Sequence, residues 1–348
     1  AAGRAPLTVR GVLTAMIKAH EIQGVLAVEN SFNRVGLDHV VLVKVASTAV
    51  VSQLLGATRD QIVDALSQAF VDGQSLRTYR HAPNAGSRKS WAAGDATSRA
   101  VRLALMTLRG EMGLPSVLSA PRWGFYDVLF QGKPFAFQRP YGSYVMENVL
   151  FKISFPAEFH AQTAVECAVK LHDQVKGRVE RIERIEITTQ EPAIRIISKD
   201  GPLHNAADRD HCIQYMVAVP LLHGRLGAEC DEDGFAADPR IDALRARTRV
   251  VEEPRFSREY YDPEKRSIGN SVQVFFSDGT ATDKVSIDYP IGHRRRRAEG
   301  IPLLVRKFEE NLATRFPPRQ AEAILALCQD AQRLEATPVH EFVDRMVI

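Results

Sequence analysis

The sequence has few cysteines, and no two of them lie close together. The four cysteines among the 348 residues are Cys167, Cys212, Cys230 and Cys328. An iron–sulfur cluster or a zinc site needs several thiolates brought together, usually including a Cys-x-x-Cys pair. We therefore expect no iron–sulfur cluster, no other cofactor and no bound metal, and we expect a reducing, cytoplasmic setting.

Long apolar runs and an excess of one charge are also missing. The longest apolar runs, at 40–45 and 216–222, fall far short of the roughly 18 residues that suggest a membrane span. The first residues contain no apolar stretch that could serve as a secretory signal. A net charge of +3 is too small to indicate a nucleic-acid partner but is compatible with a small anionic substrate. We expect neither a membrane nor a nucleic acid as partner.

Three common catalytic motifs are absent. The chain has no Gly-x-Gly-x-x-Gly after a strand, no Gly-x-x-x-x-Gly-Lys phosphate loop and no Gly-x-Ser-x-Gly nucleophile elbow. Hydride transfer, kinase and hydrolase activities therefore lose their usual sequence support.

The hydrophobic pattern predicts helices at both ends of the chain and mixed structure between them. Helices are expected at about 12–28, 38–55, 91–108, 157–175, 209–222, 303–315 and 319–334, and strands at about 179–189, 249–252, 271–276 and 284–288. Thr58-Arg59-Asp60-Gln61 resembles a capping box, and Gly56 a helix C-cap. Residues 110–144 should form an irregular connector anchored by Trp123, Phe125 and Tyr126. The last two helices should pack on the first bundle.

These elements indicate an α+β protein. We expect a helical domain at 1–150, an α+β domain with an antiparallel sheet at 151–292, and a return to the helical domain at 293–348.

A basic loop is the first site candidate. Arg77-Thr78-Tyr79-Arg80-His81 and Arg88-Lys89-Ser90 come just before a predicted helix. Backbone N–H groups at a helix start favour anions, and arginine can bind a carboxylate through two parallel hydrogen bonds. The alternative is a solvated basic loop.

Histidines beside carboxylates give two more candidates. His39 follows Asp38, which could tune its pKa or simply cap a helix. The segment 151–160 places Lys152, Glu158 and His160 at the junction of the two domains, where ligand sites are common. Its alternative is a hinge with a helix start.

Two further polar segments carry weaker signals. The loop 202–211 contains His204, Arg209 and His211, with Asp208 as a cap candidate, but lacks the ligand spacing of a metal site. The run 293–297 could bind nucleic acid, but it is short and lacks interleaved aromatics. We expect a solvated or substrate-gating loop there.

Several long segments resemble the PrpD type of the MmgE/PrpD family. The clearest are Met16-Ile17-Lys18-Ala19-His20-Glu21-Ile22-Gln23-Gly24, Ser31-Phe32-Asn33-Arg34-Val35-Gly36-Leu37-Asp38-His39 and Asp72-Gly73-Gln74-Ser75-Leu76-Arg77-Thr78-Tyr79-Arg80-His81. The likeness continues through 88–102, 139–160, 208–215 and 289–293. It covers nearly the whole chain.

The resemblance implies a mainly helical domain built from both chain ends, with an inserted α+β lid domain. It implies dehydration of 2-methylcitrate to 2-methyl-cis-aconitate in propionate breakdown, without an iron–sulfur cluster. The sequence does not decide the oligomeric state, and a homodimer is the candidate assembly. Family members extend further at the N-terminus, so we expect this chain to begin inside the helical domain. The alternatives are decarboxylation of cis-aconitate, as in another branch of the family, and a non-catalytic anion- or RNA-binding module.

Dehydration of a tricarboxylate requires its carboxylates to be held while protons move. The predicted catalytic residues are His39, His81, Lys152 and His160, and the predicted substrate-binding residues are Arg80, Arg88, Lys89, Tyr141, Tyr144, Glu158, His204 and Arg209. The sequence does not decide which histidine acts as acid and which as base.

Overall fold

The computed structural model describes residues 7–81, 83–137 and 139–348, which form two compact units. The helical unit comprises residues up to 79, 88–147 and 306–348. The mixed unit comprises residues 80–87 and 148–305. Both ends of the chain therefore contribute to the helical unit, and the predicted α+β class is confirmed.

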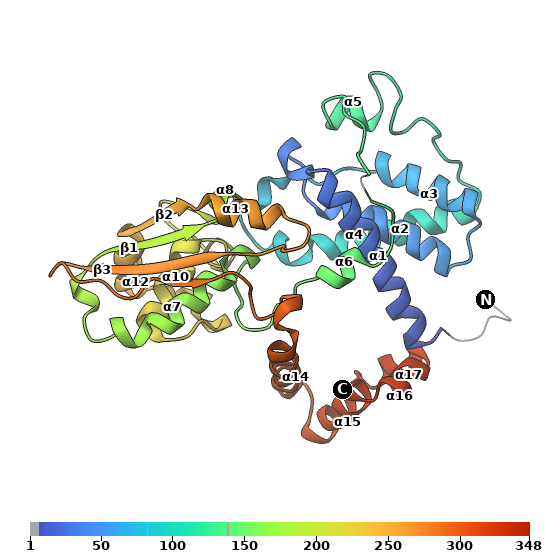
Figure 1. The fold of residues 1–348 in the computed structure, drawn as a ribbon. Coiled ribbons are helices and arrows are strands. Elements are labelled where there is room, and N and C mark those ends of the chain that lie inside the picture. Colours follow the sequence, from blue (N-terminus) through green and yellow to red (C-terminus); the bar gives the residue numbers. More distant parts are fainter. Residues whose placement is uncertain (1–6, 82, 138) are drawn as a thin grey trace. The chain divides into compact units, whose positions relative to one another are not determined.

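In the helical unit, α2 is the central element and packs against α1, α3 and α4 (Figure 1). The α-helices are α1 Val9–Glu29, α2 Val40–Leu54, α3 Arg59–Val71, α4 Arg88–Leu108, α5 Phe125–Leu129, α6 Tyr144–Asn148, α15 Pro318–Gln329, α16 Ala331–Ala336 and α17 Val339–Asp344. Two 3-10 turns, η1 Phe32–Val35 and η2 Arg77–Arg80, lie between them.

Local capping signals set the ends of α2 and α3 as predicted. Gly56, with φ of 88°, follows the last turn of α2. The Thr58 hydroxyl accepts from the Gln61 backbone at 3.3 Å, and the Gln61 side chain accepts from the Thr58 backbone at 2.9 Å. The capping box is therefore confirmed.

The C-terminal helices pack on α1, also as predicted. Val9 donates its backbone N–H to Thr337 at 2.9 Å, and Arg10 pairs with Glu335 at 2.6 Å. The single helix expected at 319–334 is wrong, because Asp330 ends α15 and caps α16 by accepting from the backbone of Arg333 at 3.0 Å.

The connector between α4 and α6 is anchored by phenylalanines. Trp123, one predicted anchor, is 81% exposed, so that prediction is wrong. Phe125 is buried, and its ring lies 5.2 Å from that of Phe70 and 5.7 Å from that of Phe130. Tyr126 contributes a half-buried ring to the same core.

The mixed unit contains one sheet with helices around it. Its main helices are α7 Gln162–Val175, α8 Glu191–Ile197, α9 Ala206–Arg209, α10 Ile213–His223, α11 Asp233–Ala236, α12 Pro239–Ala246 and α13 Pro254–Tyr261. Its strands are β1 Ile182–Thr189, β2 Thr248–Glu252, β3 Asn270–Phe276 and β4 Val285–Ile287, and its 3-10 turns are η3 Phe159–Ala161, η4 Val179–Arg181, η5 Ala228–Asp231 and η6 Arg294–Arg296. Helix α14, Arg297–Ala313, begins in this unit and ends in the helical unit.

The sheet has the order β2-β1-β3-β4 and is mixed rather than antiparallel. Strands β1 and β2 run parallel, whereas β3 is antiparallel to both β1 and β4. The prediction is wrong for β2 because the long crossover from β1, through helices α8 to α12, brings the chain back in the same direction. Helices α7, α10 and α12 lie along the sheet, and their apolar side chains form the core with β1 and β3 (Figure 1).

None of the helices in the described part of the chain combines the length and the apolar character needed to cross a membrane.

Gly292 allows a close backbone approach that no other residue type permits. Its carbonyl accepts from the backbone of Phe151 at 3.1 Å, and an added Cβ would lie 1.7 Å from the Phe151 carbonyl oxygen. We expect Gly292→Ala to lower the free energy of unfolding by about 1–3 kcal/mol, because the backbone must move to relieve the overlap. Urea unfolding measures the change. Gly234→Ala, with open space around its Cβ, is the control, and equal stability of both variants would contradict the prediction.

Candidate functional site

Both units contain predicted site residues. The helical unit contains His39, Arg88, Lys89, Tyr141 and Tyr144, and the mixed unit contains Arg80, His81, Lys152, Glu158, His160, His204 and Arg209.

Glu158 and His160 form a hydrogen-bonded pair at the start of η3. The Glu158 carboxylate accepts from the His160 backbone at 2.7 Å and lies 2.8 Å from the ring Nδ1. Asn270, the first residue of β3, donates its amide to the His160 carbonyl at 2.9 Å. The structure thus brings together two of the predicted residues. Hydrogen bonds hold the backbone N–H, the carbonyl and the ring of His160.

The carboxylate of Glu158 is largely but not fully buried, and it stays ionised. Burial alone would raise its pKa, but the charge of His160, the hydrogen bonds from His160 and the nearby His211 outweigh burial and lower the pKa to about 2. The Glu158 backbone N–H also donates to the Asp210 carbonyl at 3.1 Å, and the Asp210 carboxylate lies 2.7 Å from Nδ1 of His211. The negative charge of Glu158 is therefore bonded to one imidazole, and a second imidazole lies near it.

Tyr260 completes this cluster and was missed by the sequence analysis. Its hydroxyl lies 3.1 Å from Nε2 of His160, and the two rings stack with centroids 5.6 Å apart. Burial and the charge of Glu158 raise the pKa of Tyr260 to about 12. The contact joins residues 100 positions apart, so no local pattern could have indicated it.

The loop before α9 is joined to the segment that carries Arg80 and His81. The Asn205 amide donates to the Ala85 carbonyl at 3.0 Å. The Asn205 side chain also accepts from the backbone of Asp208 at 3.1 Å, so Asn205, not Asp208, caps α9. Asp208 is buried and instead accepts from the backbone of His204 at 3.1 Å.

Arg209 and Lys152 occupy different surroundings in the mixed unit. The guanidinium of Arg209 is buried and donates to the Asp231 carbonyl at 2.6 Å, with the Asp233 carboxylate at 2.7 Å. These contacts fit a structural role, and substrate binding by Arg209 stays a prediction. The Lys152 ammonium lies 5.1 Å from the centre of the ring of Phe159, the residue that precedes His160 in the sequence.

In the helical unit, Arg88 lines a cavity of about 340 Å³. Arg88 is the first residue of α4, so the expectation that it precedes the helix is wrong, and Lys89 lies in the same turn. The Arg88 guanidinium lies 4.3 Å from the Trp91 ring centre and 3.6 Å from the Asp95 carboxylate. The other lining residues are Gly73, Gln74, Ser75, Leu76, Thr78, Tyr79, Asp95 and Arg99. Two arginines, the Asp95 carboxylate and several uncharged polar residues thus surround a space large enough for a small anion.

An ion network that includes the buried Lys44 adjoins this cavity, and the sequence analysis missed it. Asp72 pairs with Arg99 at 3.2 Å and with Lys44 at 3.6 Å. Lys44 also donates to the backbone carbonyls of Asp72 and Gly73. Its side chain is only 3% exposed, and burial lowers its pKa to about 8 despite the charge of Asp72.

The depressed pKa of Lys44 predicts a specific pH dependence of stability. Between pH about 8 and 10.5 the unfolded chain binds the Lys44 proton and the folded chain does not, so stability rises with pH in this window. We expect the free energy of unfolding of the native chain, relative to Lys44→Met, to rise by roughly 3 kcal/mol at most across the window. Urea unfolding at both pH values tests this. A constant difference would contradict the assigned pKa.

His39 lies at the N-terminus of α2 as expected. Asp38 is fully buried, and its carboxylate accepts from the Val40 backbone at 3.0 Å, which confirms the capping interpretation. The His39 side chain is 54% exposed, with Nδ1 3.6 Å from the Asp38 carboxylate. Arg77 of the basic loop also pairs with Asp38, at 3.7 Å.

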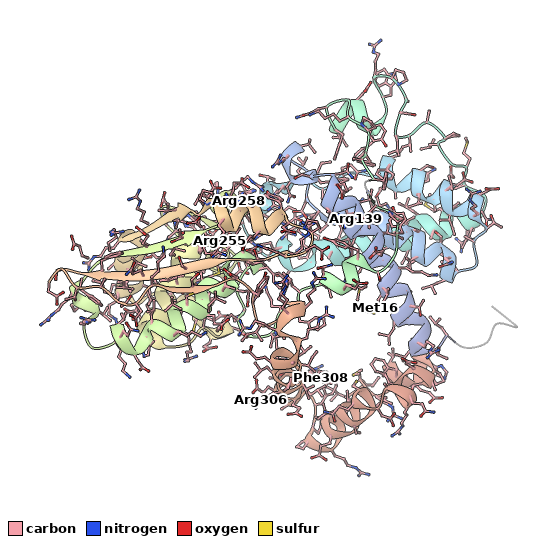
Figure 2. All side chains as sticks on the ribbon, viewed as in Figure 1. Met16, Arg139, Arg255, Arg258, Arg306 and Phe308 are labelled. Carbon is pink, nitrogen blue, oxygen red and sulfur yellow. The ribbon has the colours of Figure 1, made fainter. Side chains whose placement is uncertain are left out.

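The two predicted tyrosines lie on the segment held by Glu21. This buried carboxylate accepts from the backbones of Gly142 at 3.1 Å and Val145 at 2.9 Å. Tyr141 lines a mostly apolar cavity of about 450 Å³, and partial burial raises its pKa. The Arg139 guanidinium, labelled in Figure 2, lies 3.9 Å from the Tyr144 ring centre.

The basic run at 293–297 makes contacts within the mixed unit, so a fully solvated loop is wrong, whereas the alternative of a substrate-gating loop stays a prediction. His293 is buried, and its Nε2 lies 3.1 Å from the Lys265 carbonyl. Arg296 pairs with Glu166 and Glu299, each at 2.8 Å. Arg294 donates to the Glu264 carbonyl at 2.6 Å. The expectation that this run binds no nucleic acid stays a prediction.

Comparison with known families identifies both parts of the chain. The MmgE/PrpD N-terminal domain matches residues 1–138, and the MmgE/PrpD C-terminal domain matches residues 155–331. The chain belongs to the MmgE/PrpD family. The predicted family is thereby confirmed.

Curated relatives in the MmgE/PrpD family are highly similar to this chain. It is 68% identical to the 2-methylcitrate dehydratase of Cupriavidus necator, over 100% of this chain and 72% of that protein. It is 65% identical to the 2-methylcitrate dehydratase of Escherichia coli K12, over 100% of this chain and 73% of that protein. The mitochondrial 2-methylcitrate dehydratase of Yarrowia lipolytica is 65% identical, over 97% of this chain and 65% of that protein.

Proposed function

We propose that this protein is a hydro-lyase that dehydrates 2-methylcitrate to 2-methyl-cis-aconitate in the methylcitrate cycle of propionate breakdown. The identity of 65–68% to 2-methylcitrate dehydratases along the whole chain carries the proposal. Each unit, taken by itself, also contains acid–base and cationic groups of the kind that this chemistry requires.

The reaction divides into binding and proton transfer. The substrate carboxylates must be held, a proton must leave the carbon next to a carboxylate, and the departing hydroxide must gain a proton. Cations near the carboxylate lower the cost of the negative charge that develops on its neighbouring carbon. We assign carboxylate binding to Arg88 and Lys89 in the helical unit and to Arg80 and Lys152 in the mixed unit.

Proton transfer is assigned first to the Glu158–His160 pair. A carboxylate that accepts from Nδ1 orients the imidazole and makes it a stronger base, which is how such pairs serve in acid–base catalysis. The contact of 2.8 Å between Glu158 and His160 supports this assignment over the other histidines. His39 and His81 stay predicted acid–base residues, and Tyr141, Tyr144, His204 and Arg209 stay predicted substrate contacts. The predicted substrate contact of Glu158 also stays a prediction, beside its pairing with His160.

We further propose that the reaction needs no iron–sulfur cluster. The thiols of Cys167 and Cys212 are buried and donate to different backbone carbonyls, those of Asn270 and Lys199. Burial raises the pKa of Cys167 to about 12, which disfavours the thiolate that a cluster ligand must provide. Turnover that persists after chelator treatment would support the proposal, and loss restored by iron and sulfide would overturn it.

The assembly and location stay predictions. A homodimer is expected, and sedimentation velocity at several concentrations tests it. A reducing, cytoplasmic setting accords with the four unpaired cysteines.

The product distinguishes dehydration from the alternative reaction of the same family. Carbon-13 NMR of the purified protein with 2-methylcitrate should show 2-methyl-cis-aconitate and no carbon dioxide. With cis-aconitate it should show hydration or no reaction. Itaconate and carbon dioxide would instead establish a decarboxylase.

A further inference from the structure

The imidazole of His160 is held at both of its ring nitrogens. Glu158 occupies Nδ1 at 2.8 Å, and the Tyr260 hydroxyl occupies Nε2 at 3.1 Å. Only 12% of the His160 side chain is exposed, so water contributes little to fixing its orientation. Glu158 and Tyr260, which are far apart in the sequence, therefore together set the plane of the ring.

Helix α13, which carries Tyr260, is fixed independently of His160. Phe256 is buried directly against Gly269, where an added Cβ would lie 2.3 Å from the Phe256 ring. Arg255 pairs with Asp288 at 3.1 Å. Figure 2 labels Arg255 and Arg258 on α13. Ser257 accepts from the Glu191 backbone at 2.9 Å. The hydroxyl of Tyr260 is therefore presented from a rigid support.

The protonation of the neighbours decides the direction of each hydrogen bond. Glu158 remains a carboxylate down to pH about 2, so it accepts from an Nδ1–H. Tyr260 keeps its proton up to pH about 12, so it can donate to Nε2 of the neutral ring. Between them, the two partners favour the tautomer of His160 that has its proton on Nδ1.

We propose that Tyr260 is a positioning residue for the dehydration: before substrate binds, its hydroxyl donates to Nε2 of His160 and, with Glu158 on the other side, holds the ring in one orientation and one tautomer. The hydroxyl releases Nε2 when that nitrogen takes the proton of the substrate. The role of Tyr260 in dehydration rests on the proposed function, whereas the contact between Tyr260 and His160 is independent of it.

Tyr261 provides a matched control on the same helix. It is the neighbouring residue, and its hydroxyl donates to Glu191 at 3.3 Å instead of to His160. Nitrogen-15 NMR of histidine-labelled protein compares Tyr260→Phe with Tyr261→Phe. We expect Tyr260→Phe to move the Nε2 signal of His160 while Nδ1 keeps its N–H signature, and we expect Tyr261→Phe to move neither. An unchanged Nε2 signal in folded Tyr260→Phe would overturn the proposal.

Kinetics test whether this contact serves the reaction. We expect Tyr260→Phe to lower kcat by about 10–100-fold, as is typical for loss of a group that orients a functional residue, with KM within about 3-fold of native. Tyr261→Phe should turn over as the native chain does. An altered Nε2 signal with native kcat would overturn the positioning role. Absence of turnover by the native chain would refute the proposed function alone, because the nitrogen signals decide the contact without substrate.

Discussion

Replacement of Glu158 with glutamine is expected to lower kcat for 2-methylcitrate by about 10²–10⁴-fold, the range associated with loss of acid–base catalysis. The substitution keeps the size of the side chain but removes the charge that lies 2.8 Å from Nδ1 of His160. A neutral amide can no longer stabilise a protonated imidazole as the proton moves. Steady-state kinetics with purified protein measure the effect.

An exposed glutamate of the same unit provides the control. Glu183 lies at the start of β1 with its side chain in solvent, so Glu183→Gln changes the net charge equally without touching the cluster. Glu183→Gln should retain native kcat. If Glu158→Gln folds cooperatively and also retains native kcat, the assigned proton-transfer pair is wrong.

Arg88→Met is expected to act on binding and to raise KM by about 10–100-fold, with kcat within about 3-fold of native. Hydrogen bonds to charged groups contribute about 1.5–3 kcal/mol each, which corresponds to this loss of affinity. The Arg88 guanidinium faces Asp95 at 3.6 Å and lies over Trp91, so its charge and orientation are set before substrate arrives. Initial rates over a range of 2-methylcitrate concentrations separate KM from kcat.

Arg102 lies on the same helix and is the matched control. Its side chain is 61% exposed and pairs with Asp72 at 3.5 Å, and it is not among the residues that line the Arg88 cavity. Arg102→Met should leave KM within about 2-fold of native. Equal KM values for native protein and Arg88→Met would show that this cavity does not hold the substrate.

The local sequence was sufficient to predict where several helices of the helical unit begin and end. The ends of α2 and α3 follow from Gly56 and from the capping box at Thr58 and Gln61, because those signals act within one helical turn. The direction of β2 could not be predicted in this way. It depends on where the crossover from β1 returns, and short strands carry no local mark of parallel or antiparallel pairing.

In the candidate site, too, contacts between near neighbours in the sequence could be predicted and long-range contacts could not. Glu158 and His160 are two positions apart, so their pairing could be anticipated from the sequence. Tyr260 reaches His160 across 100 positions. Likewise, Arg296 pairs with Glu166 across 130 positions, so one arginine of a run that resembles a solvated patch is held by an internal ion pair. Such contacts become visible only in the folded chain.

The proposed activity of this chain is the removal of water from 2-methylcitrate. The most direct test mixes purified protein with 2-methylcitrate and follows the ultraviolet absorbance of the conjugated product, with and without chelator. We expect a steady rise that chelator does not abolish and that Glu158→Gln suppresses. No rise with folded native protein, under conditions where the Escherichia coli relative turns over, would contradict it.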